Sequence, residues 1–463
     1  MIRLFRVFVP VGTLALLISE ILLVTGAFIL ASYIVIPADP AEYLLYDGGF
    51  ESILLVVLSI LVGLYLNDLY TDIHLRSRII LLQQLCLVMG MAFLFQGLVS
   101  YLDAGLRMPL RLMALGSSLA MMAIYIWRNL FSAFVVRVVG RDCLLLVGDS
   151  PVLVDIAQYI GRHPEKGMVV TGYVGDFPDQ GAELPGGKVL GPLAYLREIV
   201  EATRPSHIVV GMFERRNSMP VNDLLELRFG GNIVEEAASA YERVCGRVCV
   251  KELRPSHLIY SGELGPRRQT LFYQSVSNIL FAAMGVVVTA PLMLIAALAV
   301  RLSSPGPVLY RQIRVGMDGV SFTLYKFRSM RADAEAESGA VWASKDDPRI
   351  TSVGRILRKF RLDELPQLFN VLKGEMSIVG PRPERPEFVK TLSSGIPYYR
   401  QRHCVRPGIT GWAQINYKYG DNLEDTIEKL EYDLFYIKNM SLVMDTYILF
   451  HTLKTMLLSR GAQ

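Results

Sequence analysis

The feature that most constrains this chain is a set of long apolar segments with almost no charged residues. Four of them cover residues 9–36, 52–66, 79–102 and 112–127, and a fifth covers residues 279–300. A helix needs about 20 mostly apolar residues to cross the hydrocarbon core of a bilayer. Hydrophobic residues make up 52% of the sequence and charged residues 19%, a balance more apolar than that of soluble proteins. The sequence therefore predicts four N-terminal transmembrane helices.

The charges between these segments predict their orientation. The loop of residues 37–51 carries four acidic residues and neither Lys nor Arg, whereas basic residues flank the other segment ends. Because Lys and Arg gather in cytoplasmic loops, the N-terminus and everything after Trp127 are expected in the cytoplasm. Glu20, a costly charge inside the first segment, is expected to face another helix or a partner subunit. The flanking basic residues are Arg3, Arg6, His74, Arg76, Arg78, Arg128, Arg137 and Arg141.

Alternating strands and helices follow from residue 140 to residue 262. This alternation predicts a doubly wound, Rossmann-like α/β domain. Of the G-x-G-x-x-G fingerprint of dinucleotide sites only Gly148 is present, so a regulatory or interaction role is favoured over nucleotide binding. The strands are predicted at residues 143–147, 169–174 and 207–211, and a helix at residues 152–160.

Charge and cysteine content exclude several other classes of protein. A net charge of +4 is too small to indicate nucleic-acid binding. Cys245 and Cys249 have no nearby His or second Cys pair that would complete a zinc site. Neither a disulfide framework nor a metal site is indicated by the five cysteines, which fits a reducing compartment.

A basic stretch between Arg301 and Arg331 suits phosphorylated substrates or anionic lipid headgroups. A solvated face is the alternative. If residues 325–330 form a strand, its alternation places Lys326 and Arg328 on one face, where two cations can hold a diphosphate. An ordinary edge strand with two basic residues is the competing interpretation.

Adjacent carboxylates at Asp363 and Glu364 lie within residues 354–370. One carboxylate can attack phosphorus while the other holds Mg²⁺, which neutralises a diphosphate. A surface salt bridge between Lys359 and Asp363 at i,i+4 is the alternative, and the pair by itself favours it. The stretch is predicted to be one helix because its apolar residues have helical spacing. These apolar residues are Ile356, Leu357, Phe360, Leu365, Leu368 and Phe369.

Two proline-flanked arginines form a third cluster. Pro381 and Pro383 stiffen the backbone around Arg382, and Pro407 follows Arg406 directly. A guanidinium held in this way suits bidentate contact with phosphate, whereas the alternative is two rigid loops without a ligand.

The fifth apolar segment, residues 279–300, carries Pro291 near its middle, where a kink is expected. A fifth full crossing would place the basic and acidic clusters outside the cell, away from cytoplasmic nucleotide substrates. A re-entrant helix that enters one leaflet and returns is therefore expected, although hydropathy also allows an ordinary kinked span. Residues 440–460 are predicted to be an amphipathic helix, either on the membrane surface or in a domain core.

From about Gln274 to the C-terminus the sequence resembles the bacterial sugar transferase family, the monotopic phosphoglycosyl transferases. The four apolar segments and the α/β domain before this region look like its large members, such as undecaprenyl-phosphate glucose or galactose phosphotransferases. The motifs that carry the resemblance are the segment from Lys326 to Met330, Leu362-Asp363-Glu364-Leu365-Pro366-Gln367, Asn370-Val371-Leu372-Lys373-Gly374, Val379-Gly380-Pro381-Arg382-Pro383 and Arg406-Pro407-Gly408-Ile409-Thr410-Gly411-Trp412.

This resemblance implies transfer of a hexose-1-phosphate from a UDP-sugar to polyprenyl (undecaprenyl) phosphate, with release of UMP. Asp363 would form a covalent aspartyl-phosphosugar intermediate, and Glu364 would bind Mg²⁺ or assist proton movement, with both carboxylates as expected metal ligands. Lys418 stands where many smaller members carry Arg, and it lacks the bidentate fork. The expected substrate-binding residues are Lys326, Arg328, Arg358, Arg382, Arg406 and Lys418.

The expected organisation has three parts. A four-helix transmembrane region covers residues 1–130, a cytoplasmic regulatory α/β domain residues 140–262, and an α+β catalytic domain residues 272–463. The re-entrant membrane helix of the catalytic domain covers residues 279–300, with the break at Pro291. The protein is expected to be a multi-pass protein of the bacterial inner membrane with its catalytic domain on the cytoplasmic face.

The expected partners are a UDP-sugar, polyprenyl phosphate and the lipid bilayer, with a homodimer suggested by the large relatives and no nucleic acid. Initiation of exopolysaccharide, O-antigen or capsule biosynthesis is the implied role. Two rival functions remain open: a glycosyltransferase that releases UDP, and a membrane scaffold that has kept an inactive catalytic fold.

Overall fold

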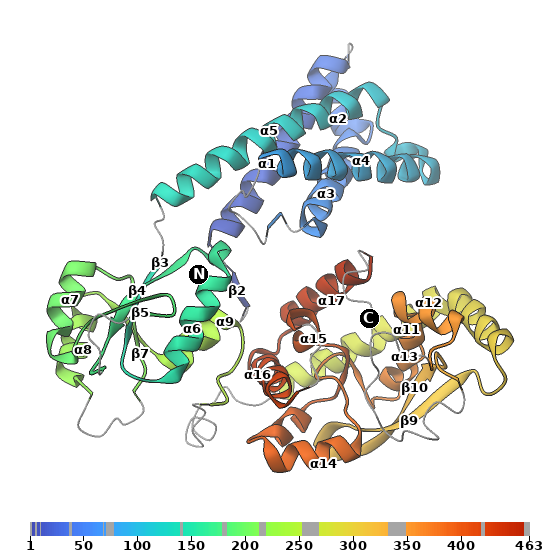
Figure 1. The fold of residues 1–463 in the computed structure, drawn as a ribbon. Coiled ribbons are helices and arrows are strands. Elements are labelled where there is room, and N and C mark those ends of the chain that lie inside the picture. Colours follow the sequence, from blue (N-terminus) through green and yellow to red (C-terminus); the bar gives the residue numbers. More distant parts are fainter. Residues whose placement is uncertain are drawn as a thin grey trace. The chain divides into compact units, whose positions relative to one another are not determined.

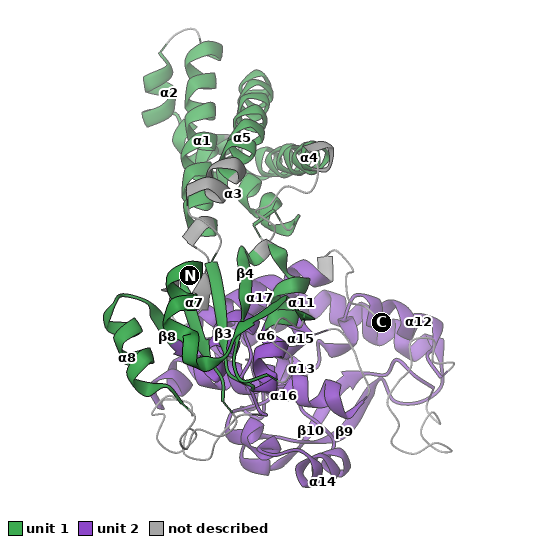
Figure 2. Ribbon diagram, turned by 60° about the vertical axis from the view of Figure 1, so that its left-hand side comes forward, with its two compact units in different colours: residues 1–3, 8–149, 157–234 green, residues 4–7, 150–156, 235–463 purple. Residues whose placement is uncertain are grey.

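The structure is a computed structural model (Figure 1). Contacts divide the chain into two compact units (Figure 2): residues 1–3, 8–149 and 157–234, and residues 4–7, 150–156 and 235–463. The residues that it describes are 2–4, 7–9, 11–36, 39–67, 69–70, 78–138, 142–177, 183–212, 219–251, 268–331, 349–417 and 422–457. A two-stranded sheet at the start of the chain joins β1 (Ile2–Leu4) to β2 (Val7–Val9).

Four long apolar helices form the N-terminal part of the first unit. They are α1 (Val11–Val35), α3 (Gly49–Leu66), α4 (Arg78–Leu102) and α5 (Leu110–Val138), joined by α2 (Pro40–Tyr46) and η1 (Ala104–Leu106). Each of the four is long and apolar enough to cross a membrane, which confirms the predicted apolar helices. The fourth helix ends at Val138, past the predicted end at Trp127. The prediction followed the apolar residues, whereas the helix continues into a segment that contains charged residues.

These helices are apolar on both their inner and outer surfaces. Phe28, Ile60 and Leu85 are fully buried in the core of the bundle. On the outside, Leu22 is 68% exposed and Leu94 is 78% exposed. A helix that is apolar all round belongs in a lipid environment, so this part of the chain is a membrane region.

Glu20 of α1 forms a buried ion pair with Arg128 of α5. Arg128 Nε lies 2.6 Å from Glu20 Oε1 and Nη2 lies 3.0 Å from Oε2. The remaining Nη1 group donates to the backbone oxygen of Leu69 at 2.6 Å. The expectation that Glu20 faces another helix is therefore confirmed, and both charges are satisfied inside the bundle.

Replacing Glu20 by Leu is expected to destabilise the bundle by about 3–5 kcal/mol, because it leaves the buried Arg128 guanidinium without a counter-charge. Thermal unfolding of the detergent-solubilised protein measures this loss. Leu22→Ala, on the lipid-facing side of the same helix, is the matched control and is expected to change the melting temperature little. Equal melting temperatures for Glu20→Leu and the wild type would contradict the prediction.

A six-stranded sheet follows, in the order β5-β6-β4-β3-β7-β8. The pairs β3–β4, β3–β7 and β4–β6 are parallel and β5–β6 is antiparallel, so the sheet is mixed. Its strands are β3 (Asp142–Val147), β4 (Met168–Val174), β5 (Glu183–Leu184), β6 (Gly187–Gly191), β7 (His207–Val210) and β8 (Ile233–Glu236). Its helices are α6 (Pro151–Arg162), η2 (Pro164–Lys166), η3 (Leu193–Tyr195), α7 (Leu196–Thr203) and α8 (Val221–Phe229).

The three strands predicted from the sequence are β3, β4 and β7, at the middle of this sheet. Their apolar runs are buried, with Leu145, Val147, Val174 and Ile208 in one cluster. Central parallel strands are covered on both faces, which is why they read as continuous apolar runs and were visible in the sequence.

The second unit is built around α11 (Arg268–Ser303), a helix that continues without interruption through Pro291. An antiparallel hairpin joins β9 (Leu309–Val315) to β10 (Ser321–Phe327), and β11 (Ser377–Val379) runs parallel to β12 (Gly408–Thr410). The other elements are α9 (Ala237–Cys245), η4 (Met317–Gly319), α12 (Ser352–Lys359), η5 (Leu362–Glu364), α13 (Gln367–Leu372), α14 (Pro386–Gly395), η6 (Tyr399–Cys404), α15 (Trp412–Asn416), α16 (Leu423–Asn439) and α17 (Leu442–Leu457).

The main core of this unit gathers around α16 and α17. Leu434 and Tyr436 of α16 pack with Met444 and Ile448 of α17. The opposite face of α17 stays apolar and exposed, with Phe450 at 53%. The helix predicted over residues 440–460 thus contributes one face to a domain core, so the core interpretation holds for that face.

The segment after β8 also belongs to this unit. Tyr241 of α9 donates to Glu431 Oε2 at 2.9 Å, and the backbone nitrogen of Val250 donates to Glu431 Oε1 at 3.1 Å. The indole nitrogen of Trp412 donates to the backbone oxygen of Gly246 at 2.8 Å. Residues 241–250 are therefore integrated with α15 and α16.

Candidate active site

The two adjacent carboxylates lie at a break between helices, and not inside one helix as predicted. Helix α12 ends at Lys359, and Arg361 then adopts a left-handed conformation with φ of 53°. Asp363 and Glu364 occupy the 3-10 turn η5, and Pro366, which has no backbone N–H, precedes α13. The apolar residues do have helical spacing, but Arg361 lies outside the right-handed helical region of φ/ψ and so interrupts the helix. Because α12 ends at Lys359, the proposed i,i+4 pairing of Lys359 with Asp363 on one helix is wrong.

Glu364 is held by cations from two other parts of the unit. Lys326 Nζ, on β10, lies 2.9 Å from Glu364 Oε1. Arg382 Nη2 lies 3.4 Å from the same oxygen, and Arg361 Nη1 lies 3.9 Å from Oε2. The carboxylate is 11% exposed, so these ion pairs are shielded from solvent. One oxygen of Glu364 is thus saturated, and the other has only a distant cation.

Asp363 is also buried, at 8% exposure, but it is not paired. Among the residues that the structure describes, no hydrogen bond or ion pair reaches its carboxylate. Lys326, Arg358 and Arg382 are close enough to act on it electrostatically. The carboxylate therefore lies in a positive field with both oxygens uncommitted.

Burial and the field of these cations act differently on the two carboxylates. Burial, and then the neighbouring Glu364, raise the pKa of Asp363 above its usual value, against the opposing cations. Burial would also raise the pKa of Glu364, but Lys326, Arg382 and Arg361 together lower it to about 2. Glu364 is therefore a permanent anion, whereas Asp363 is the carboxylate whose protonation changes with pH. A pair with divergent pKa values is typical of catalytic carboxylates.

Arg358 lies on α12 and is oriented by Ser329, whose Oγ accepts from Arg358 Nε at 2.9 Å. Helix α12 approaches that serine closely, because a Cβ on Gly354 would lie 1.9 Å from the backbone oxygen of Ser329. The first turn of α12 is capped by Thr351, which accepts from the backbone nitrogen of Gly354 at 2.9 Å. These contacts hold Arg358 beside the carboxylates.

The structure does not bring Arg328 to the carboxylates. Strand β10 ends at Phe327, and the buried guanidinium of Arg328 instead donates to the residues that follow α11. Its Nη2 lies 2.6 Å from the backbone oxygen of Ser304, and its Nη1 lies 3.1 Å from that of Pro305. In this structure Arg328 secures the end of α11.

Among the described residues, Arg406 makes no ion pair with either carboxylate and contacts α11 instead. Arg406 Nη1 donates to Ser275 Oγ of α11 at 2.6 Å. Pro291 lies further along the same helix. Lys418 lies outside the described residues. Of the predicted phosphate ligands, the structure therefore groups Lys326, Arg358 and Arg382 around the two carboxylates.

The loops that carry Arg382 and Arg406 are joined backbone to backbone. Gly408 N donates to Pro381 O at 2.9 Å, and Gly380 N donates to Thr410 O at 2.9 Å. A Cβ on Gly408 would lie 2.1 Å from the nitrogen of Gly380, so a side chain does not fit there. The two motifs, although separate in the sequence, thus form one rigid platform.

Sequence reasoning missed two buried residues that hold this platform, Arg402 and Asp433, and it placed Arg314 only in the basic stretch between Arg301 and Arg331. Arg402 Nη2 lies 2.7 Å from Asp433 Oδ2 and 3.0 Å from the backbone oxygen of Arg382. Burial raises the pKa of Asp433 to about 6, although Arg402 opposes this, and the residue remains ionised at neutral pH. The available signal was an aspartate between Tyr432 and Leu434, in the stretch that forms the buried part of α16.

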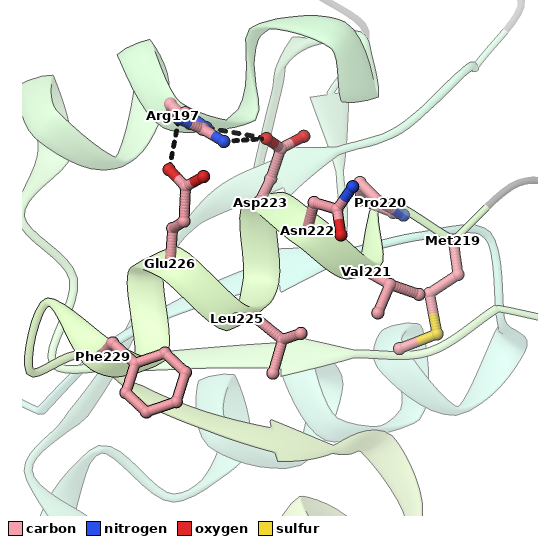
Figure 3. A pocket seen from close by; sticks show the side chains of 9 residues that line it. All are labelled: Arg197, Met219, Pro220, Val221, Asn222, Asp223, Leu225, Glu226 and Phe229. Atoms are coloured by element: carbon pink, nitrogen blue, oxygen red, sulfur yellow. Dashed lines mark hydrogen bonds and ion pairs between the residues drawn. The ribbon is translucent and has the colours of Figure 1, made fainter.

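The α/β part contains an open depression of about 700 Å³ beside α8 (Figure 3). Arg197 forms ion pairs there with Asp223 and with Glu226 (Figure 3). The other lining side chains include Leu225 and Phe229, which lie away from these ion pairs (Figure 3). This depression contains none of the predicted site residues, and its charged lining residues are engaged in ion pairs with one another.

Among the described residues there is no group of three or more His, Cys, Asp or Glu side chains that could hold a metal ion by itself. A divalent cation at Asp363 and Glu364 would need ligands from a substrate, as is usual for Mg²⁺ on phosphates.

Comparison with known proteins bears on the same region. The sequence pattern of the family described as "Bacterial sugar transferase" matches residues 269–459, which include every residue of this cluster. A UDP-N-acetylgalactosamine-undecaprenyl-phosphate N-acetylgalactosaminephosphotransferase of Aeromonas hydrophila is 46% identical over 222 residues, 48% of this chain and 52% of that protein. A UDP-glucose:undecaprenyl-phosphate glucose-1-phosphate transferase of Escherichia coli (strain K12) is 47% identical over 38% of each chain.

The chain thus spans about half the length of the Aeromonas relative. A UDP-glucose:undecaprenyl-phosphate glucose-1-phosphate transferase of Xanthomonas campestris pv. campestris is matched more fully, with 34% identity over 344 residues, 70% of this chain and 69% of that protein. This match extends well beyond the part of the chain that carries the carboxylates. By this extent of similarity, together with the family pattern over the site, the chain belongs to the bacterial sugar transferase family.

Proposed function

We propose that this protein transfers a hexose-1-phosphate from a UDP-sugar to a polyprenyl phosphate, such as undecaprenyl phosphate, and releases UMP. The observation that carries the proposal is the uncommitted, buried Asp363 carboxylate beside a Glu364 that cations hold ionised. The names of the relatives, which act on undecaprenyl phosphate, support the acceptor and the sugar-1-phosphate that is moved. The product would begin a polysaccharide such as an exopolysaccharide, O-antigen or capsule.

The reaction would proceed in two displacements. An Asp363 oxygen attacks the β-phosphorus of the UDP-sugar, and the bond from that phosphorus to the bridging oxygen breaks, so that UMP leaves with the electron pair. An oxygen of the polyprenyl phosphate then attacks the same phosphorus, and the bond to Asp363 breaks. Covalent catalysis of this kind needs a nucleophile that is not engaged elsewhere, and this supports Asp363 over Glu364.

The surrounding cations would stabilise charge that develops on the phosphates. Arg358 and Arg382 offer planar guanidinium groups that match phosphate oxygens, and Lys326 offers a point charge. Three cations, Lys326, Arg358 and Arg382, act on two carboxylates, so the site has positive charge in place before substrate arrives. Preorganised charge of this kind is the usual main source of rate acceleration in phosphoryl transfer.

Mg²⁺ fits this donor set, because the uncommitted oxygens of Asp363 and the less engaged Oε2 of Glu364 are the hard oxygen ligands it prefers. When bound with the diphosphate, the ion would supply charge neutralisation at the phosphates. Glu364 would hold it, and the cations around Glu364 would keep that carboxylate ionised for the purpose.

We further propose that α11 enters the bilayer as a re-entrant helix and that the sheet of the first unit is a Rossmann-like regulatory domain. The apolar exterior of α11, with Val287 at 74% exposure and Ile295 at 63%, supports membrane entry. Pro291 removes one backbone hydrogen bond within it, which favours a bend. Four preceding membrane helices would return the chain to the cytoplasmic face of the bacterial inner membrane, where nucleotide sugars are made.

Nucleotide release tests the proposal. Purified protein in detergent receives polyprenyl phosphate, Mg²⁺ and a panel of UDP-sugars, and the nucleotide product is identified. UMP that depends on the lipid is the expected result, and it names the sugar. UDP would identify a glycosyltransferase instead. Folded protein that releases no nucleotide across a wide panel would leave the inactive scaffold as the function.

The acid limb of the pH profile should report Asp363. Its carboxylate must be ionised to attack, so UMP release is expected to fall as pH is lowered through a pKa above the usual aspartate value of about 3.9. Lys326→Met removes a cation that lowers this pKa, and so should move the acid limb to higher pH. Lys390→Met, an exposed lysine of α14, is the control and should leave the limb unchanged. An unchanged limb in Lys326→Met would contradict this assignment.

A further inference from the structure

All four backbone oxygens of residues 381–384, the loop that carries Arg382, accept hydrogen bonds. Two of the donors are backbone nitrogens and two are arginine side chains. This loop is buried or half-buried, so its carbonyls need partners other than water, and four bonds in succession fix its backbone. The bonds are Gly408 N to Pro381 O at 2.9 Å, Arg402 Nη2 to Arg382 O at 3.0 Å, Arg314 Nη1 to Pro383 O at 2.9 Å and Val315 N to Glu384 O at 2.9 Å.

Arg402 is the more deeply buried of the two arginines. It is 7% exposed, and its Nη1 donates to the hydroxyl of Tyr399 at 2.8 Å. Its Nη2 lies 2.7 Å from Asp433, a carboxylate of α16 that is 2% exposed. Both charged groups are thus removed from solvent. The same nitrogen of Arg402, Nη2, donates both to Asp433 and to the backbone oxygen of Arg382. Burying an ion pair is costly, and the contact with Arg382 gives a reason for it.

Arg314 approaches the same loop from β9. Besides Pro383 O, it pairs with Glu384, whose Oε2 lies 3.5 Å from Arg314 Nη1. Its Nε donates to Gln312 Oε1 at 2.9 Å, which fixes the plane of the guanidinium. Burial lowers the pKa of Arg314 to about 10, so it stays charged at neutral pH. The loop is therefore held by two arginines, and among the described residues neither pairs with Asp363 or Glu364.

We propose that Arg402, seated by Asp433 and Tyr399, is a positioning residue: it holds the backbone of Arg382 so that the Arg382 guanidinium stays at Glu364. The inference rests on the proposed function for its effect on rate, but the geometry of the loop is independent of the substrate. A displacement of about 1 Å at a reacting centre can cost about 100-fold in rate. Arg402 is 7% exposed, and its hydrogen bonds go to Tyr399, Arg382 O and Asp433, so its effect on rate is expected to pass through Arg382.

The sharpest test replaces the ion pair by apolar side chains, in the double variant Arg402→Met with Asp433→Leu. Apolar replacement of a buried pair usually keeps stability, so thermal unfolding should match the wild type or exceed it. The expected result is a fall of about 100-fold in both kcat and kcat/KM for UMP release, which is the pattern seen when an interaction specific to the transition state is removed. A folded double variant with the wild-type rate would overturn the proposal.

Arg402→Lys is the second variant, for the case that the double variant does not fold. Lysine keeps the charge for Asp433 but cannot bond the carbonyl, the hydroxyl and the carboxylate with one planar fork. A loss of about 10-fold or more in kcat, in folded protein, is expected, and an unchanged kcat would count against the proposal. The matched control is Glu431→Gln, two residues before Asp433 and 3% exposed, which contacts residues 241–250 and is expected to leave kcat unchanged.

Hydrogen–deuterium exchange separates this inference from the proposed function. If wild-type protein releases no UMP from any sugar, the proposed function fails, while exchange still tests the loop. Peptides covering residues 380–385 should exchange faster in the Arg402→Met and Asp433→Leu double variant than in the wild type and in Glu431→Gln. Equal exchange in these three proteins would show that Arg402 does not hold the loop.

Discussion

Asp363→Asn is expected to reduce UMP release by about 10⁴-fold, the loss typical of removing a catalytic nucleophile. The amide has nearly the same size as the carboxylate, and among the described residues no hydrogen bond or ion pair depends on its charge, so the fold should be kept. Steady-state UMP release with the preferred UDP-sugar measures the effect. Asp363→Ala guards against residual activity that arises from deamidation of the asparagine.

A second readout follows the covalent step itself. Wild-type protein given a UDP-sugar labelled in the sugar, without acceptor lipid, should retain label after denaturation, and Asp363→Asn should not. Glu387→Gln, an exposed carboxylate of α14, is the control and should behave as the wild type in both assays. Retention of label by both Asp363 variants would assign the nucleophile to another residue.

Gly408→Ala is expected to destabilise the second unit strongly. The added methyl group would lie 2.1 Å from Gly380 N, 2.4 Å from Thr410 O and 2.7 Å from Gly380 Cα. All three are backbone atoms, so relief requires the backbone around Gly408 to shift away from Gly380 and to change its own conformation, at a cost of about 3 kcal/mol. For a unit of this size that corresponds to a fall of about 6–12 °C in melting temperature. Because Arg382 lies on the same platform, UMP release should fall as well.

Gly395→Ala is the matched control, because nothing lies within 4 Å of its added methyl group. It ends α14, where alanine favours helix more than glycine does, so its melting temperature should equal or exceed that of the wild type. Thermal unfolding in detergent compares the two variants. Equal shifts for Gly408→Ala and Gly395→Ala would contradict the argument from backbone contact.

The same platform explains why this site tolerates buried charge. Glu364 and Asp433 are both nearly inaccessible, and each is paired with a cation that also contacts the Arg382 segment or belongs to it. Burial removes water from the charged groups of each ion pair, which costs free energy. In return, the two ion pairs fix the position of Arg382. Losing one partner would leave the other charge unpaired, so substitutions in this set are expected to be coupled and not additive.

Local features of the sequence determined several results by themselves. The four N-terminal helices and the central strands β3, β4 and β7 were predicted correctly, because hydrophobic length and continuous apolar runs are properties of neighbouring residues. Glu20 was expected to meet a partner because an unpaired charge in lipid is costly. The adjacent carboxylates were visible as a chemical pair without any knowledge of their surroundings.

Other results depended on contacts between distant residues. Helical spacing across residues 354–370 concealed the left-handed Arg361, since periodicity reports the apolar face but not the conformation of a single residue. Which cations reach Glu364 was also beyond sequence: Lys326 and Arg382 do, from 38 and 18 residues away.

Arg402 and Asp433, 31 residues apart, are joined only by the packing of η6 against α16. Charge and spacing along the chain indicate what a side chain can do, but ion-pair energies depend on distances and burial that only the folded chain supplies. The sequence alone therefore determined the membrane helices, the central strands and the kind of chemistry, and the tertiary structure decided which charges act together.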